Sequence, residues 1–254
     1  MGDPNEQAAA ADKTPAIRGA AFGPEGRTIP APPDVPGGLQ AHQRTVYRVT
    51  LNLLLPAEPD ALLESPDAVA ANAIDDRMPY WAFAWDAAEP LIAALPDLVG
   101  DLPSGSHVVE IGCGLGLVAM AAAIARPDLT IEASDHDAMA IELLATNAAA
   151  NGLGNLSTCV RDWATPDAAT FVLASDVLYE TRFHSVLLSR FGQELSAGTQ
   201  AVWISDPGRA TSAVFFEQAA RSGLVVDVFA ADRQPVDGGF RTGCTQLVRL
   251  MRSR

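Results

Sequence analysis

The sequence predicts an α/β domain built on a doubly wound, mostly parallel sheet, and three observations predict it. An apolar run at 107–111 leads through closely spaced glycines into an Ala-rich helical segment at 117–125. From residue 107 onward, short apolar runs alternate with segments of helical period, which is typical of a parallel sheet with helices on both faces. Seven strand-like runs occur in all, and Gly238 and Gly239 predict a hairpin-type turn before the last of them.

The individual elements follow in chain order. The helix at 117–125 stops before Pro127, and Asp137 is expected to cap the next helix, which Gly152 ends. A later helix places Phe183, Leu187 and Phe191 at i, i+4 and i+8, a stripe that faces the core. Further helices are expected at 87–95 and 210–222, and the predicted strands are 108–111, 129–134, 156–160, 170–174, 201–204, 224–229 and 245–250.

The N-terminal part is predicted to form a tail and a cap, not a second domain. Residues 1–40 are rich in Ala, Pro and Gly and have no apolar period, which favours a disordered or loosely docked tail. Residues 45–54 are rich in β-formers, and short helical turns are expected at 59–64 and 68–74. The predicted organisation is a tail at 1–40 followed by one domain at 41–254, which comprises an N-terminal cap at 41–95 and a Rossmann-like core at 96–254.

Composition narrows the classes of function. The formal net charge of −14 disfavours nucleic acid as a partner, because phosphate contacts depend on clustered Lys and Arg. This negative charge would steer a basic substrate toward the protein, but a negative net charge can also serve only to keep the protein soluble. The three cysteines have no metal-ligand spacing, which predicts no metal site and fits a reducing cytoplasm. No run approaches the roughly 18 consecutive apolar residues of a membrane helix, so no membrane association is expected.

Glycines at 112, 114 and 116 predict a ligand-binding turn, because residues without a Cβ allow a sharp strand-to-helix turn and close approach of a ligand to the backbone. Their G-x-G-x-G spacing differs from the G-x-G-x-x-G of dinucleotide sites. Glu110, inside the strand, would face phosphates unfavourably and instead suits an ammonium group, such as that of S-adenosylmethionine. A dinucleotide oxidoreductase is therefore the weaker hypothesis, and an ordinary tight turn is the alternative without a ligand.

Further candidates lie at or near the carboxyl ends of predicted strands, where one crevice of a doubly wound sheet can collect them. Asp135 lies where an acid can accept hydrogen bonds from both ribose hydroxyls. Asp162 can meet the adenine amino group, and Trp163 beside it can cover the ring. Asp176 and Tyr179 follow the run at 170–174, where the methyl-accepting atom would lie. For each of these residues, a purely structural role as a strand-end acid, helix cap or core aromatic is the alternative.

The remaining candidates are neighbours of these residues. Trp85 belongs to the aromatic segment 78–86, which lies either beside the cofactor and the substrate entrance or as a hydrophobic plug between cap and core. Cys113 is expected as a small filler between loop glycines, and His136 as a surface or packing residue beside the ribose acid. The predicted cofactor-binding set is Trp85, Glu110, Gly112, Cys113, Gly114, Gly116, Asp135, His136, Asp162, Trp163 and Ser175, and the predicted catalytic residues are Asp176 and Tyr179.

Several motifs together resemble the seven-β-strand, S-adenosylmethionine-dependent methyltransferases of family 16, many of which are protein lysine methyltransferases. The segments Pro79–Trp85 and Asp206–Arg209 resemble the branch that methylates lysines of the electron transfer flavoprotein β subunit. The resemblance covers about residues 45–250. The other motifs that carry it are Glu110-Ile-Gly-Cys-Gly-Leu-Gly116, Ser134-Asp135, residues 147–152 and Asp176-Val-Leu-Tyr179.

The resemblance implies a class I methyltransferase fold, S-adenosylmethionine as cofactor, and a lysine of a protein such as the electron transfer flavoprotein β subunit as methyl acceptor. One departure concerns residues 86–90, which read Asp-Ala-Ala-Glu-Pro where the branch continues Pro-Gly-Gly-Gln, so the substrate-side wall and the substrate can differ. A small-molecule N- or O-methyltransferase and a non-catalytic cofactor-binding module are alternatives on the same fold. The resemblance implies cofactor contacts at Trp85, Glu110, Gly112, Gly114, Asp135 and Trp163, and an acceptor pocket shaped by Asp176 and Tyr179.

Overall fold

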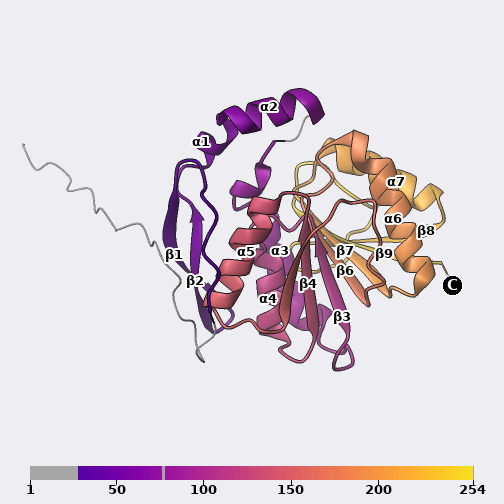
Figure 1. The fold of residues 1–254 in the computed structure, drawn as a ribbon. Helices are drawn as coiled ribbons and strands as arrows, with labels where there is room; N and C mark the ends of the chain where they lie inside the picture. The colour runs from indigo at the N-terminus through magenta and orange to yellow at the C-terminus, as the bar shows by residue number, and fades with distance from the viewer. Residues whose placement is uncertain (1–27, 76–77, 254) are drawn as a thin grey trace, which may run out of the picture.

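The structure is a computed structural model that describes residues 28–75 and 78–253. A seven-stranded sheet, in the order β5-β4-β3-β6-β7-β9-β8, forms its centre and carries helices on both faces (Figure 1). All neighbouring strands pair in parallel except β9, which pairs antiparallel with both β7 and β8. The strands are β3 (His107–Ile111), β4 (Thr130–Asp135), β5 (Leu156–Val160), β6 (Phe171–Ser175), β7 (Ala201–Asp206), β8 (Leu224–Ala230) and β9 (Gln246–Arg252).

This sheet confirms the predicted doubly wound α/β fold with an antiparallel last strand. Each predicted strand ends within two residues of the observed one. The central strands β3, β6 and β7 are buried on both faces, which is why their sequences are continuous apolar runs without alternation. Sheet order reverses between β3 and β6, so the carboxyl ends of these two strands flank the switch point where α/β sheets bind ligands.

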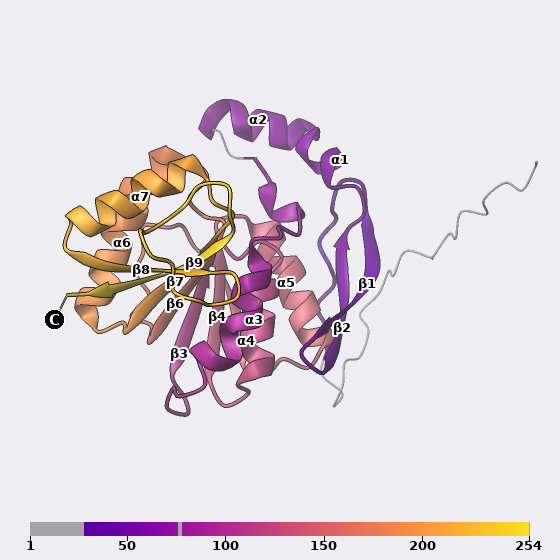
Figure 2. The same cartoon turned by 180° about the vertical axis from the view of Figure 1, so that it is seen from behind.

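Helices form a layer on each face of the sheet (Figures 1 and 2). Alternate residues of β3 show the division: Val108 belongs to the apolar cluster that contains residues of α3, α4 and α5, whereas Val109 belongs to the cluster that contains residues of α6 and α7. The predicted cap boundary after residue 95 falls inside α3, which packs against α4 and is therefore part of the core layer. The bounds are α3 (Ala88–Leu98), α4 (Leu117–Ala125), α5 (Ala138–Ala150), α6 (His184–Ala197) and α7 (Ala210–Arg221).

Local signals place the helices that follow β3 and β4. Gly116 precedes α4 with a φ of 70°, and a Cβ at this position would lie 2.3 Å from Cδ1 of Leu144 in α5, so both backbone and packing require glycine. Asp137 caps α5 as predicted, because its Oδ1 accepts hydrogen bonds from the amides of Met139 and Ala140. Gly152, with a φ of 68°, follows the end of the same helix.

The segment before the core contains a β-hairpin, where the sequence predicts a single strand at 45–54. Strands β1 (Leu39–Val46) and β2 (Val49–Pro56) pair antiparallel around Tyr47, whose φ is 54°. A Tyr-Arg turn lacks the Asn-Gly or Gly-Gly chemistry that marks tight hairpins, so the turn has no clear signal in the sequence. Of the predicted tail, residues 1–27 lie outside the described residues, whereas Val35 is buried in the main core.

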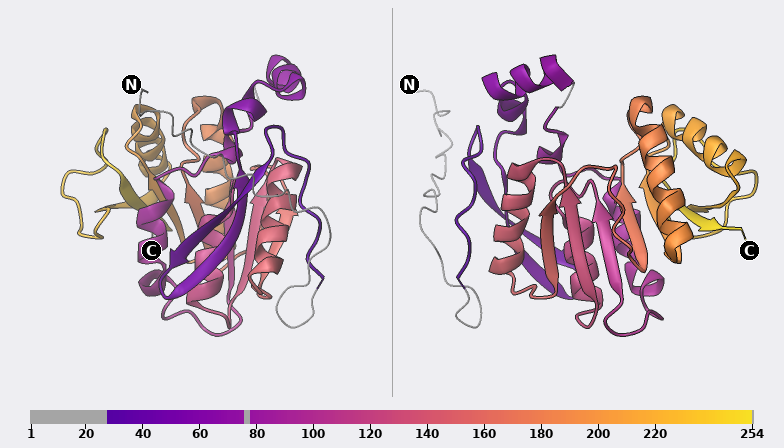
Figure 3. Two further views of the ribbon diagram at one scale, coloured as in Figure 1. Left: turned by 90° about the vertical axis from the view of Figure 1, so that its left-hand side faces the viewer. Right: turned by 45° about the vertical axis from the view of Figure 1, so that its right-hand side comes forward.

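Two amide side chains, one in α5 and one at its C-cap, hold the hairpin on the core. Asn147 accepts a hydrogen bond from the Leu54 amide at 2.8 Å and donates one to the Leu54 carbonyl at 3.0 Å. Asn151 makes the same pair with the backbone of Asn52, at 2.8 Å each. The chain then continues above the sheet through three short elements, seen at the top of both views in Figure 3. These are α1 (Pro59–Leu63), α2 (Pro66–Asp75) and the 3₁₀ turn η2 (Tyr80–Ala82).

Candidate active site

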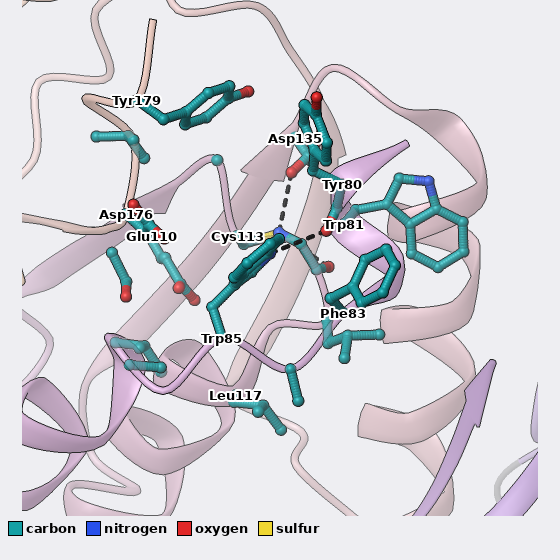
Figure 4. A pocket seen from close by; sticks show the side chains of 18 of the residues that line it. Tyr80, Trp81, Phe83, Trp85, Glu110, Cys113, Leu117, Asp135, Asp176 and Tyr179 are labelled. Atoms are coloured by element: carbon teal, nitrogen blue, oxygen red, sulfur yellow. Dashed lines mark hydrogen bonds between the residues drawn. The ribbon is translucent and has the colours of Figure 1, made fainter. Parts of the chain in front are cut away.

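A cleft opens at the carboxyl ends of β3, β4 and β6, beside the switch point of the sheet. Its lining comes from the aromatic segment 78–88, the glycine loop 110–118, and residues that end or follow β4, β5 and β6 (Figure 4). The cleft is open to solvent, and its empty volume, open mouth included, is about 730 Å³. All the site residues predicted from the sequence line this cleft except Gly116 and Asp162.

Glu110 forms the buried acidic end of the cleft. Its side chain is 2% exposed, and its Oε2 accepts a hydrogen bond of 2.7 Å from the amide of Ala119 in the first turn of α4. Burial raises the pKa of Glu110 from its ordinary 4.5 to about 8; the negative charge of Asp135 adds to the rise, while the Ala119 amide opposes it. A buried carboxyl in this state accepts a proton or a bound cation in place of lost hydration.

Asp135 ends β4 and shapes the glycine loop. Its Oδ2 accepts a hydrogen bond of 2.9 Å from the Gly114 amide, and its Oδ1 accepts one of 3.0 Å from the Asp137 amide. The Nδ1 atom of His136 lies 3.2 Å from the same Oδ1. The carboxylate is therefore fixed at the cleft wall while its remaining lone pairs can still accept hydrogen bonds from a ligand.

Three further predicted residues complete this wall. Gly112 lies against Trp163, and a Cβ on Gly112 would sit 3.2 Å from the indole nitrogen, so a side chain would push the ring away. Burial raises the pKa of the Cys113 thiol well above its ordinary range, with Asp135 and Glu110 adding to the rise, so the thiol stays protonated and fits the expected filler role. Ser175 Oγ is buried and, among the described residues, has no hydrogen-bond partner in the protein.

The opposite wall is aromatic. Tyr80 meets Tyr179 edge-on, with ring centroids 5.7 Å apart, and Tyr179 meets Trp163 at 6.4 Å. Trp85 packs at a tilt against Phe83, donates its indole N–H to the Tyr80 carbonyl at 3.0 Å, and leaves 43% of its surface exposed at the mouth. Such rings exclude water and attract cations through their faces.

Asp176, predicted as catalytic, has an ion-pair partner that the sequence reasoning did not assign. The guanidinium of Arg209 donates two hydrogen bonds to its carboxylate, at 2.6 and 2.7 Å. Asp176 has a φ of 54°, the left-handed region. Tyr179 follows in the same loop, and burial is the main cause that raises the pKa of its hydroxyl, so this group stays protonated and can donate a hydrogen bond.

Two predicted cofactor-binding residues do not line the cleft. Gly116 serves the packing of α4 on α5 instead, because the space beside its Cα is filled by the side chain of Leu144. Asp162 accepts hydrogen bonds from the Ala164 amide and the Thr165 hydroxyl, and it lines an adjoining cavity that shares Trp163 with the cleft. The spacing of these residues in the sequence could not distinguish residues that shape the glycine loop from residues that face the cleft.

Several lining residues were not singled out from the sequence. They are apolar or aromatic; some belong to the aromatic segment, which gives no indication of which rings face inward, and the others flank the glycine loop or follow β6. Within residues 28–75 and 78–253, no three His, Cys, Asp or Glu side chains gather closely enough to hold a metal ion, and no helix is both long and apolar enough to cross a membrane. The additional lining residues are Met78, Tyr80, Trp81, Phe83, Ala84, Ala88, Leu115, Leu117, Val118 and Val177.

The cleft residues fit S-adenosylmethionine by their chemistry. Glu110 offers a buried acceptor to an ammonium group, and Asp135 offers carboxylate lone pairs at a strand end, where a ribose is bound in doubly wound folds. Gly112 and Gly114, with φ values of 57° and 51°, let a ligand approach the backbone between them. The unpartnered hydroxyl of Ser175 provides one more polar group that a ligand can satisfy.

Comparison with known proteins shows similarity to methyltransferases over part of the chain. The family model described as "Methyltransferase small domain" matches residues 86–171, which include the glycine loop, Asp135 and Trp163. Residues 86–171 therefore resemble a methyltransferase domain. A solved methyltransferase, the ribosomal protein L11 methylase of Lactobacillus delbrueckii subsp. bulgaricus, has the same fold, with a TM-score of 0.50 and 19% identity over 68% of this chain and 81% of that one.

Two curated methyltransferases are similar in sequence. The electron transfer flavoprotein beta subunit lysine methyltransferase of Danio rerio is 31% identical over 140 residues, which cover 52% of this chain and 51% of the relative. The trans-aconitate 2-methyltransferase of Rhodococcus jostii (strain RHA1) is also 31% identical, over 130 residues covering 51% of this chain and 48% of the relative. The chain thus spans about half the length of the curated methyltransferases it matches.

Proposed function

We propose that this protein transfers a methyl group from S-adenosylmethionine to the side-chain nitrogen of a lysine in another protein. The observation that carries the proposal is one continuous cleft lined by Glu110, Asp135, Asp176, Tyr179 and an aromatic segment. Glu110 and Asp135 suit a ligand with an ammonium group and a ribose, and the aromatic rings suit an acceptor that carries a cationic group.

In this proposal, three side chains of the cleft bind three different parts of the cofactor. Glu110 accepts a hydrogen bond from the ammonium group of the cofactor, Asp135 accepts from its ribose hydroxyls, and Trp163 covers its adenine. When bound, S-adenosylmethionine supplies a methyl group made electrophilic by its sulfonium sulfur. The remaining task is alignment of the acceptor and exclusion of water. The side chains of Trp81, Tyr80 and Trp85 are placed to exclude water.

A lysine acceptor must lose a proton before it can react. Its reference pKa of about 10.4 makes this cost roughly 4–5 kcal/mol near pH 7. Removal from water in an aromatic pocket lowers that cost, because desolvation disfavours the ammonium form. Asp176 and Tyr179 orient the nitrogen, and the proton leaves to water. Asp176 acts by position and not as a base, since a bare carboxylate would hold the ammonium protonated.

The lysine assignment has support from sequence similarity as well as from the cleft. The Danio rerio relative is named for methylating lysine of the electron transfer flavoprotein beta subunit, which makes that subunit the first partner to test. The net charge of −14 favours encounter with a basic region of a partner. A second candidate, methylation of a small molecule, is favoured by the equal identity to the trans-aconitate methyltransferase.

The deciding experiment is transfer of a labelled methyl group. The purified protein is incubated with methyl-labelled S-adenosylmethionine and a cell lysate, and proteins are then separated from small molecules. One labelled protein band, with the label mapped to a lysine by peptide mass spectrometry, would support the proposal. Purified electron transfer flavoprotein β subunit, tested alone, would establish or exclude that partner.

Two controls make the outcome specific. Excess S-adenosylhomocysteine should abolish labelling by competition, and the Asp135→Ala variant should label less at limiting cofactor because its ribose contact is removed. Label found only in small molecules would move the assignment to the second candidate. No label in either fraction, together with calorimetric binding of the cofactor, would indicate a module that binds without catalysing.

A further inference from the structure

A rigid turn after β7 lies beside the loop that carries Asp176. Asp206 is fully buried, and its Oδ1 accepts hydrogen bonds from the amides of Gly208 at 2.8 Å and Arg209 at 3.0 Å, while its Oδ2 accepts one from the hydroxyl of Ser212. Gly208, with a φ of 88°, lies so close to another backbone segment that a Cβ would be 2.5 Å from the Cys244 amide nitrogen. The turn 206–209 therefore has little freedom to move.

The same turn and the start of α7 hold the acceptor loop 176–179. Arg209 forms the bidentate pair with Asp176 that was described above, the geometry in which Arg–carboxylate contacts are strongest and most directional. Thr211 donates its hydroxyl to the Leu178 carbonyl at 3.0 Å, and the His184 ring nitrogen lies 3.2 Å from that carbonyl. The Asp176 amide donates to the Ser205 carbonyl at 2.9 Å. These contacts hold Asp176 in its left-handed conformation.

We propose that Arg209 is a positioning residue for methyl transfer, which fixes the Asp176 carboxylate in the acceptor pocket and cancels its negative charge. The inference rests on the proposed function. Asp176 lines the cleft and Arg209 does not, so Arg209 acts through Asp176 and not by touching the acceptor. The paired oxygens keep lone pairs that can accept a hydrogen bond from the acceptor nitrogen.

Charge cancellation matters because the reactive form of an amine acceptor is neutral. A lone carboxylate beside the amine favours the ammonium form and suppresses the reaction at neutral pH. The Asp176–Arg209 pair carries no net charge and leaves the amine easier to deprotonate while still orienting it. Removal of Arg209 alone should therefore move the acidic limb of the pH–rate profile to higher pH, and removal of Asp176 alone should move it to lower pH.

Other titratable groups face the pair and must be held constant. Asp206 lies behind it, and burial raises the pKa of that carboxyl. Tyr179 lies in the same loop and His184 in α6 contacts that loop. The other titratable groups that line the cleft are Tyr80, Glu110, Cys113, Asp135 and His136. Because all of them are present in every variant, the comparison uses differences between profiles measured at saturating cofactor.

The test is a double-mutant series on the full chain, with the acceptor found by labelling. Arg209→Met should lower kcat about 10- to 100-fold with unchanged affinity for the cofactor, measured by calorimetry. Arg209→Lys keeps the charge but loses the bidentate geometry, so it should restore the position of the acidic limb and only part of kcat. The Arg209→Met/Asp176→Asn double variant should be no slower than Asp176→Asn alone, because Arg209 then has no carboxylate to position.

Arg221→Met is the matched control, since Arg221 lies in α7 in an exposed pair with Glu217 and should not change kcat. Wild-type kcat in Arg209→Met, or losses that simply multiply in the double variant, would overturn the positioning role. If Arg209→Met does not fold, Arg209→Lys with an unchanged kcat would overturn it equally. If the wild-type protein methylates no acceptor, the proposed function fails and this inference falls with it. If the wild-type protein methylates an acceptor and Arg209→Met keeps full kcat, the inference alone fails.

Discussion

Glu110 is a buried carboxyl whose charge should depend on the cofactor. Its pKa of about 8, set mainly by burial, means that the free protein carries a mostly neutral Glu110 at pH 7. An ammonium group bound beside the carboxyl favours the charged form, so a proton should leave as the cofactor binds. The perturbation that tests this coupling is Glu110→Gln, which keeps the shape of the neutral side chain and cannot ionise.

The size of the effect follows from the raised pKa. With a pKa of about 8, ionising Glu110 costs about 1.4 kcal/mol at pH 7 and about twice that at pH 6. Each pH unit below the pKa therefore lowers the affinity for the cofactor about tenfold. Cofactor affinity should therefore rise about tenfold from pH 6 to pH 7, a range in which the cofactor's own ammonium group stays protonated. Near pH 6.5 the binding of one cofactor should release about 0.9 proton.

Calorimetry in two buffers measures that proton. Phosphate and Tris have different ionisation enthalpies, so the difference between the two apparent binding enthalpies gives the number of protons released. Glu110→Gln should remove both the buffer dependence and the pH dependence, and it should bind roughly 10- to 100-fold more weakly at pH 8 because a charge-assisted hydrogen bond is lost. Glu142→Gln, an exposed residue of α5, is the matched control. Equal enthalpies in both buffers for the wild-type protein would refute the reasoning.

The same ionisation should appear in stability without any ligand. The folded-state pKa of Glu110 is raised from 4.5 to about 8, so the folded protein binds the proton more tightly than the unfolded chain does. Its stabilising contribution is complete below pH 4.5 and is lost as the pH rises through 8, at up to about 1.4 kcal/mol per pH unit. Urea denaturation across this window should show a steeper decline for the wild-type protein than for Glu110→Gln.

Three further predictions concern the residues that shape the cleft. Asp135→Ala should weaken cofactor binding about 10- to 100-fold, because the ribose acceptor and the Gly114 amide contact are both lost; an unchanged calorimetric Kd would contradict its ribose role. Gly116→Ala should lower the free energy of unfolding by about 2–4 kcal/mol, because the added Cβ collides with Leu144 in a left-handed backbone. The control Gly192→Ala, with open space around the added Cβ, should not lower it. Equal urea denaturation midpoints for Gly116→Ala and the wild-type protein would contradict the packing role of Gly116. Asn147→Ala should speed hydrogen exchange at the Leu54 amide and cost about 1–3 kcal/mol, and unchanged exchange would show that the hairpin does not depend on Asn147.

Local sequence was sufficient for the architecture of the core. The apolar runs at β3, β6 and β7, the glycines of the loop and the Asp137 cap each act within a few residues, through backbone conformation and hydrogen bonding, so they can be read without knowing the fold. Strand ends in a parallel sheet share one edge, which brings Glu110, Asp135 and Asp176 into one cleft.

The sequence by itself therefore determined the α/β sheet, the position of the glycine loop and the acids around it. Only the tertiary structure decided that Arg209 pairs with Asp176 across 33 positions, that Asn147 and Asn151 hold the N-terminal hairpin, and that Gly116 packs and does not line the cleft. It also decided the pKa of Glu110. The physical reason is the same in each case: long-range pairing and desolvation depend on which atoms surround a group after folding, and no local pattern carries that information.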